Sequence, residues 1–157
     1  MTPDDNGFKG DTPVASRFLF EVDDVQIGVF TEVTGLALKV DVEEFQEGGE
    51  NSFTHKLPGR ITWPHIVLKR GVTDSDALFQ WVNKSAGDGF AANGNKLTRS
   101  TGAITIINTQ NERERAWEFS EVFAVRWTGP NFDVTSGEPL QEELEIAHHG
   151  FKSKTFH

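Results

Sequence analysis

The stretch WEFSEVFAVRW (residues 117–127) decides the fold class of this chain. Large apolar side chains recur at almost every second position from Trp117 to Trp127, and smaller or more polar residues lie between them. A period of two is typical of a β-strand, because successive side chains of a strand point to opposite faces. Thr128-Gly129-Pro130 ends the pattern with residues that favour a turn.

The same period of two continues through most of the chain. One helix is also indicated over residues 74–84, with Thr73 or Asp74 as its cap and Leu78, Trp81 and Val82 on one apolar side. The pattern therefore predicts a mainly β, antiparallel barrel or sandwich with one short α-helix. The predicted strands cover residues 18–23, 26–33, 36–43, 61–70, 101–109, 117–127 and 140–150.

The predicted strand 36–43 has two faces of opposite character. Leu36, Leu38, Val40 and Val42 form an apolar face, and Lys39, Asp41 and Glu43 lie on the other side. This pattern predicts a half-buried strand whose polar face meets water or a partner. A sheet that is polar along one face suits the wall of a large water-filled barrel shared by several subunits, whereas a monomer with one solvated face is the ordinary alternative.

A long polar loop is predicted over residues 46–59, within EEFQEGGENSFTHKLPGR (43–60). Gly48-Gly49 allows a sharp reversal, and Pro58-Gly59 favours a turn back. A hairpin needs only about two to five loop residues, so we expect this longer excursion to serve binding or assembly. A surface loop without a role is the alternative. The residues assigned to an inter-subunit or inter-ring contact are Gly48, Gly49, Glu50, Asn51, Ser52, Phe53, Thr54, His55, Lys56, Leu57 and Pro58.

Length and composition bound the class of protein. A chain of 157 residues predicts a single domain, which we place at residues 17–151 between a flexible N-terminal tail (1–16) and a short C-terminal tail (152–157). The absence of cysteine excludes disulfides and thiolate metal sites, and a net charge of −9 disfavours nucleic-acid binding. The first fifteen residues lack an apolar signal-peptide core, so we expect synthesis in the cytoplasm.

No catalytic, cofactor or metal motif is present in the sequence. GxGxxG, GxxxxGK[ST], HExxH and GxSxG are all missing. His148 and His149 are neighbours on a predicted strand, so they point to opposite faces and do not hold one metal together. Trp63 beside Pro64 is the best candidate for an exposed aromatic that stacks on a sugar. We therefore predict no enzyme activity, no cofactor and no metal site.

Six segments in order resemble the tail-tube proteins of contractile-tailed phages and of phage-like contractile injection systems. The resemblance runs from about residue 17 to residue 151, and its combination of segments is more specific than any one of them. The segments are FLFEVDDVQIGVFTEVTGL (18–36), EFQEGGEN (44–51), LPGR (57–60), LKRGVTDSDALFQWV (68–82), WEFSEVFAVRWTGP (117–130) and ELEIAHHGF (143–151).

The resemblance implies a structural subunit with the fold shared by type VI secretion tube proteins. Such subunits form six-membered rings with a continuous barrel around a lumen, and the rings stack into a hollow tube inside a contractile sheath. The loop after EFQEGGEN would then reach a neighbouring subunit or the adjacent ring, and Lys39, Asp41 and Glu43 are candidates to face the lumen. Implied partners are sheath, baseplate, terminator, and a tape-measure or cargo protein. The implied location is a phage tail or injection-system particle, inside the cell or released.

The sequence departs from the family pattern at two positions and leaves two other functions open. His149 stands where an acidic residue is expected, and Ala124 stands where proline is common. A baseplate or tube-capping ring protein of the same assembly is one alternative. A monomeric β-sandwich that binds glycans at Trp63 is the other.

Overall fold

The computed structural model of the protein describes residues 17–45, 55–73, 75–85 and 100–156. This part of the chain contains eleven strands and one helix, where the sequence pattern predicts seven strands and one helix. The elements are β1 (Arg17–Val22), β2 (Val25–Phe30), β3 (Glu32–Thr34), β4 (Lys39–Phe45), β5 (His55–Thr62), β6 (Ile66–Gly71), α1 (Ala77–Ser85), β7 (Gly102–Ile107), β8 (Arg113–Phe119), β9 (Phe123–Thr128), β10 (Gln141–Ala147) and β11 (Phe151–Thr155). The predicted tail 1–16 lies outside the described residues.

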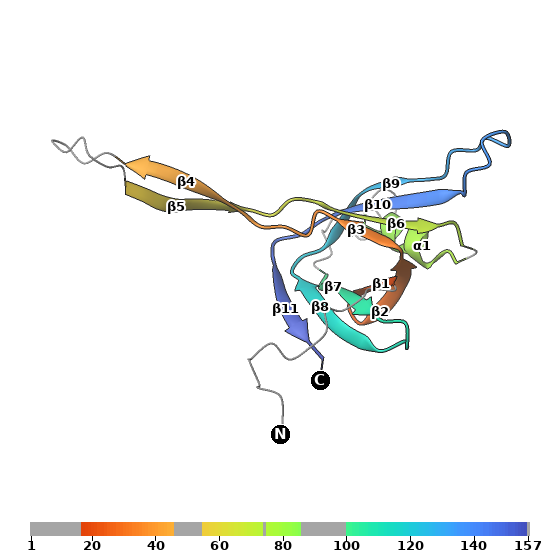
Figure 1. The fold of residues 1–157 in the computed structure, drawn as a ribbon, viewed down its shortest axis with the longest axis horizontal. Helices are drawn as coiled ribbons and strands as arrows, with labels where there is room; N and C mark the ends of the chain where they lie inside the picture. The colour runs from red at the N-terminus through yellow and green to blue at the C-terminus, as the bar shows by residue number, and fades with distance from the viewer. Residues whose placement is uncertain (1–16, 46–54, 74, 86–99, 157) are drawn as a thin grey trace, which may run out of the picture.

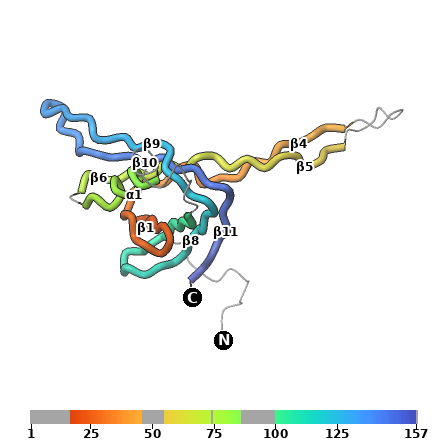
Figure 2. The backbone as a smooth tube through the Cα atoms, turned by 180° about the vertical axis from the view of Figure 1, so that it is seen from behind, coloured from red at the N-terminus to blue at the C-terminus, as the bar shows by residue number. Residues whose placement is uncertain are grey.

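The strands form two antiparallel sheets and a separate hairpin. One sheet has the order β11-β8-β7-β1-β2, the other has the order β3-β6-β10-β9, and β4 pairs only with β5. Figure 1 shows the two sheets gathered into one body from which the hairpin projects, and Figure 2 shows the same arrangement from behind. The prediction of a mainly β, antiparallel fold with one short helix is confirmed. The described strands of this single chain leave open sheet edges at β11, β2, β3 and β9 and do not close into a barrel.

The core lies between the two sheets. Phe20 and Phe30 come from the five-stranded sheet and are fully buried, as are Leu68 and Leu144 from the four-stranded sheet. The rings of Phe20 and Phe30 meet edge to face at 6.4 Å. Burying a side chain of this size contributes about 1.5–3 kcal/mol, so this layer is the main source of stability. The buried apolar cluster contains Phe20, Val22, Ile27, Phe30, Ile66, Leu68, Leu78, Trp81, Ile104, Phe119, Val122, Ala124, Leu144 and Ile146.

The predicted helix exists, but it begins later than expected. The carbonyl of Asp76 accepts a hydrogen bond from the Gln80 amide at 2.9 Å, so the first turn starts there. Asp74, one of the two predicted caps, lies outside the described residues. The helix buries Leu78 and Trp81, as its apolar periodicity predicts. The Trp81 ring meets Phe20 edge to face at 5.5 Å. The helix therefore covers the part of the core that lies beside β2 and β9.

The stretch 117–127 is two strands in different sheets, not the single strand that its alternation predicts. β8 ends at Phe119 in one sheet, and β9 begins at Phe123 in the other. Between them Glu121 adopts a left-handed backbone with φ 53°. The Val122 amide donates to the Ser100 carbonyl at 2.8 Å, which holds this corner in place. Alternation continues across the corner, so it gives no sign that the chain changes sheets.

Three further predictions differ from the structure. The predicted strand 26–33 divides into β2 and β3, and a bulge in the β1–β2 pairing places Phe30 in the core while Val29 stays exposed. The predicted strand 61–70 is interrupted at residues 63–65, where β5 ends and β6 has not begun. The predicted C-terminal tail is partly ordered, because β11 pairs with β8 along its whole length.

A buried ion pair connects the two central strands of the smaller sheet. The Arg70 Nε of β6 donates to the Glu142 carboxylate of β10, and the side chains are only 5% and 11% exposed. The indole N–H of Trp127 donates to the second Glu142 oxygen at 3.2 Å. The Arg70 guanidinium also lies 5.2 Å from the centre of the Phe30 ring. Both ions thus have several partners, as a pair removed from water requires.

Candidate assembly surfaces

The β4–β5 hairpin leaves the body of the protein and exposes both of its faces. Every residue of β4 is exposed, and in β5 only Gly59 is partly covered. The two strands pair with each other and with no other described strand (Figure 1). A two-stranded hairpin alone in water is at best marginally stable. In the described part of the chain, the strand pairing of β4 and β5 is therefore supported by no third strand.

One face of the hairpin is an exposed apolar surface. Val40 lies opposite Ile61, and Val42 lies opposite Pro58. Val40, Ile61 and Val42 are 41%, 52% and 60% exposed, and Leu38 extends the same row at 50%. The prediction that this strand is half-buried is wrong for Leu38, Val40 and Val42 in the single chain, because nothing in the described residues covers their side, whereas Leu36 is partly buried against the core. We call Leu38, Val40, Val42, Pro58 and Ile61 the apolar hairpin face.

The other face of β4 carries three charged side chains, and the exposed Phe45 follows them in the same alternation. Lys39, Asp41 and Glu43 alternate with the apolar residues and are all exposed. Because side chains two residues apart share a side of a strand, these three form one row. Their assignment to the lumen stays a prediction.

Only part of the predicted assembly loop is described. Gly48 to Thr54 lie outside the described residues. His55, Lys56, Leu57 and Pro58 belong to β5, not to a loop, and they pair with Phe45, Glu44, Glu43 and Val42 in that order.

Strand geometry is possible at Pro58 because each strand of a two-stranded hairpin has a free edge, where the N–H that proline lacks is not needed. A register shift between Val40 and Val42 accommodates the extra residue at Gly59-Arg60.

An aromatic cluster fixes the root of the hairpin to the body. His148 is 6% exposed, and its ring centre lies 5.0 Å from Phe119 and 5.9 Å from Trp63. Trp63 also meets Phe151 edge to face at 5.1 Å. His148 Nδ1 accepts a hydrogen bond from the Gly150 amide at 3.1 Å, which needs an unprotonated nitrogen there. His149 instead points to solvent, where its ring lies 2.8 Å from the Glu121 carboxylate.

Burial lowers the pKa of His148 from its ordinary value of 6.5, and the charges of His149 and His65 lower it further. Just below pH 6.5, His148 is therefore protonated in the unfolded chain but stays neutral in the folded chain. We expect the free energy of unfolding to fall as the pH drops through 6.5 toward the lower pKa of the folded state. Urea titrations between pH 7.5 and pH 5 measure this loss.

The His148→Phe variant isolates this effect, because phenylalanine fits among aromatic rings and does not titrate. We expect its stability to vary less with pH than that of the wild type. His149→Gln is the matched control, since His149 is exposed, and it should keep most of the wild-type pH dependence because burial is the largest cause of the His148 shift. Equal pH dependence in wild type and His148→Phe would rule out His148 as the source.

A second protruding surface lies at the end of the body away from the hairpin. It is the connection between β9 and β10 (residues 129–140), which we call the β9–β10 arm (Figure 1). Phe132 and Val134 are 79% and 102% exposed near its tip. The Asp133 carboxylate accepts from the Thr135 amide at 2.9 Å and from the Thr135 hydroxyl at 2.6 Å, and these bonds lower the pKa of Asp133. The tip is therefore held by its own hydrogen bonds while it presents apolar side chains to solvent.

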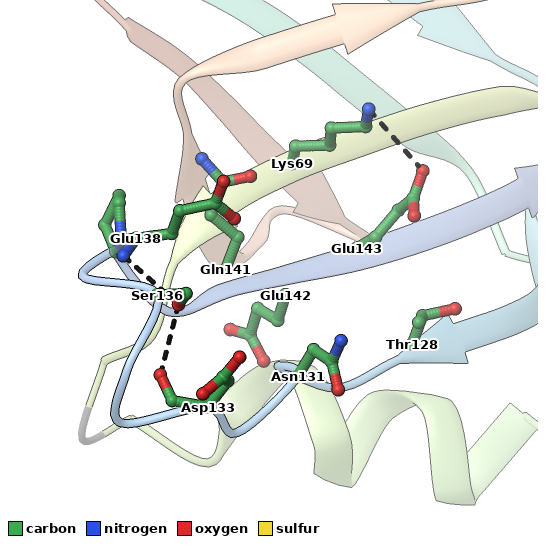
Figure 3. A pocket seen from close by; sticks show the side chains of 11 residues that line it. Lys69, Thr128, Asn131, Asp133, Ser136, Glu138, Gln141, Glu142 and Glu143 are labelled. Carbon is green, nitrogen blue, oxygen red and sulfur yellow. Dashed lines mark hydrogen bonds and ion pairs between the residues drawn. The ribbon is translucent and has the colours of Figure 1, made fainter.

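An acidic cavity of about 380 Å³ opens at the base of this arm. Asp133 and Glu138 of the arm and Glu142 and Glu143 of β10 line it, and Lys69 lies 3.9 Å from Glu143 (Figure 3). Among the described residues no group of three or more acidic or histidine side chains is arranged to hold a metal ion. We therefore interpret the cavity as a charged surface feature.

Neither surface carries a recognisable catalytic arrangement in the part of the chain that the structure describes. Trp63, the candidate for sugar stacking, packs against His148 and Phe151 and is only partly exposed. Sequence reasoning did not identify the β9–β10 arm, although the isolated Phe132 and Val134 in a Gly- and Pro-containing loop are a usable signal. In the described ranges, no helix combines the length and the apolar character needed to cross a membrane.

The chain is similar to several known proteins. A chain of the sheath-tube complex of PVC, an extracellular contractile injection system, in the extended state is 26% identical with a TM-score of 0.75, covering 96% of this chain and 95% of that one. A chain of the PVC sheath/tube terminator is 27% identical with a TM-score of 0.74, covering 94% and 99%. In fold alone the chain is similar to Hcp1 from Salmonella typhimurium, at 8% identity and a TM-score of 0.51, covering 90% and 87%.

A comparison with curated proteins gave no match. The family model described as T4-like virus tail tube protein gp19 matches residues 14–152, which is most of the chain. The chain therefore belongs to the T4-like virus tail tube protein gp19 family.

Proposed function

We propose that this protein is the structural subunit of the inner tube of a contractile tail or phage-like contractile injection system. The observation that carries the proposal is the apolar hairpin face, which the described residues of one chain leave open to water. An exposed apolar patch on an ordered strand pair marks an interaction site, and on an isolated protein it is an aggregation hazard. Covering it with identical copies removes that hazard.

The proposed assembly is a hexameric ring that stacks into a hollow tube, which sheath contraction drives through a target envelope. The β4–β5 hairpin and the predicted contact residues 48–58 reach a neighbouring subunit or the adjacent ring. Open edges at β2, β9 and β11 give further surfaces for copies of the chain. Family membership and the similarity to a PVC sheath-tube chain support this arrangement.

The polar row Lys39, Asp41 and Glu43 is proposed to face the lumen. It lies on the side of β4 opposite the apolar hairpin face, so burial of one face leaves the other toward water. The chain has a net charge of −9, which favours a lumen that repels anionic cargo and lets it pass without sticking. The proposed partners are sheath, baseplate and terminator proteins, with a tape-measure or cargo protein in the lumen. The proposed location is a phage-tail-like particle.

A second candidate function is a ring that caps the tube or belongs to the baseplate. The similarity to a chain of the PVC sheath/tube terminator at 27% identity favours it. The two functions differ in how the chain assembles, because a tube subunit stacks without limit and a capping protein stops at one ring.

Imaging the purified protein by negative-stain electron microscopy over a range of concentrations separates the two. Hollow tubes support the first function, and single rings at every concentration support the second.

A further inference from the structure

We propose that the β9–β10 arm of one copy docks at the root of the β4–β5 hairpin of the next copy, through opposite charges. The inference rests on the proposed function and names the two surfaces that meet in the assembly. Such a contact requires two different sites on each chain, one acidic and one basic, and both must be accessible to solvent in the single chain. The structure provides both.

The acidic site is the β9–β10 arm. Residues 129–140 contain Asp133 and Glu138 and no lysine or arginine, and the cavity at their base adds Glu142 and Glu143. Glu142 is satisfied by Arg70 and Glu143 lies 3.9 Å from Lys69, but none of the described cations pairs with Glu138. Figure 3 shows Glu138 on the loop above the cavity. This end of the molecule therefore presents uncompensated negative charge beside the exposed Phe132 and Val134.

The basic site is a shallow concavity of about 530 Å³ at the hairpin root. Arg60, Ile61, Thr62, Trp63, His148 and His149 line it, and none of these is acidic. Arg60 is exposed, and no acidic side chain in the described ranges forms an ion pair with it. The one carboxylate beside this concavity is that of Glu121, which lies 2.8 Å from His149, so among the described residues Arg60 keeps an unpaired positive charge there. Ile61 links this concavity to the apolar hairpin face.

The positions of the two sites decide which copies meet. The hairpin and the arm project in opposite directions from the body (Figure 1). A contact between two identical sites would place acid against acid or base against base, and juxtaposed like charges cost several kcal/mol. Contact between unlike sites pairs Arg60 with acidic groups and exposed apolar side chains with each other. Such a head-to-tail contact repeats, so it generates a ring when it closes and a filament when it does not.

Charge reversal with rescue tests this contact. Arg60→Glu and Glu138→Lys should each lower the fraction of protein in pelleted rings or tubes about tenfold, because each brings like charges together. The double variant restores opposite charges with exchanged signs and should regain most of the wild-type assembly. Glu138 is chosen over Asp133 because the Asp133 carboxylate holds the arm together.

Glu112→Lys is the matched control for Glu138→Lys, since Glu112 is exposed in the β7–β8 turn and the charge change is the same. It should assemble like the wild type. Circular dichroism checks that every variant is folded. Wild-type assembly without rescue by the double variant, or normal assembly of either single variant, would overturn this inference alone. A wild-type chain that stays monomeric would overturn the proposed function, and this contact with it.

Discussion

Val42→Asp is expected to give a folded protein that no longer forms rings or tubes. Val42 is 60% exposed in the single chain, at the middle of the apolar hairpin face. The substitution removes no core contact, so its effect on the fold should stay within about 0.5 kcal/mol, as for other surface changes. In the proposed assembly this face is covered by another copy, where an unpaired carboxylate costs several kcal/mol. Pelleting and electron microscopy measure the loss of assembly, and circular dichroism measures the fold.

Val42→Thr is the control for this experiment. Threonine has nearly the same shape and also favours strands, but it adds a hydroxyl and no charge. We expect this variant to form tubes at a somewhat higher protein concentration than the wild type. Normal tubes from Val42→Asp would show that the apolar hairpin face is not buried by assembly.

Arg70→Ala is expected to destabilise the folded chain by about 3–5 kcal/mol, because it leaves the buried Glu142 carboxylate without its main partner. Arg70 is 5% exposed, and its loss also removes the contact with the Phe30 ring. The Trp127 indole alone then remains on Glu142. Urea unfolding followed by tryptophan fluorescence measures the change in the free energy of unfolding.

Two comparisons make this prediction specific. Arg126→Ala breaks an exposed pair with Glu145 at 3.4 Å and should cost at most about 1 kcal/mol. The double variant Arg70→Met with Glu142→Leu removes both ions and should be more stable than Arg70→Ala, because no charge is left buried alone. Equal losses for Arg70→Ala and Arg126→Ala would mean that the buried pair has no special role.

The sequence predicts the fold class because period-two alternation is a local property of each strand. Residues 18–22, 102–107 and 141–147 are strands as expected, and the helix buries Leu78 and Trp81 as its spacing predicts. The same alternation does not predict where the chain passes from one sheet to the other. The chain turns between β8 and β9 at Glu121, which has a positive φ. Glutamate seldom adopts a positive φ, so the residue type does not predict this turn. The alternation around it depends only on neighbours in the chain, so it is the same with or without a corner.

The assembly surfaces were predictable only in part. The alternation of Leu38, Val40 and Val42 predicts an apolar side and a polar side, but in the single chain all three residues are exposed. Alternation indicates that one side of a strand is buried, but it does not indicate whether the residues that bury it belong to the same chain. For β4, no other described strand packs on its apolar side. The β9–β10 arm has no period, so the sequence signals it only through the isolated Phe132 and Val134 of its loop, and the fold shows that both are exposed. In the proposed assembly, both surfaces have their partner on another copy of the chain.

The most direct test of the central claim is negative-stain electron microscopy of the purified wild-type protein over a range of concentrations. If the chain is a tube subunit that hides its apolar hairpin face by self-assembly, rings appear first and hollow tubes follow as the concentration rises. Monodisperse single chains at every concentration would contradict this account, because the exposed face at Val40, Val42 and Ile61 would then be stable in water without a partner.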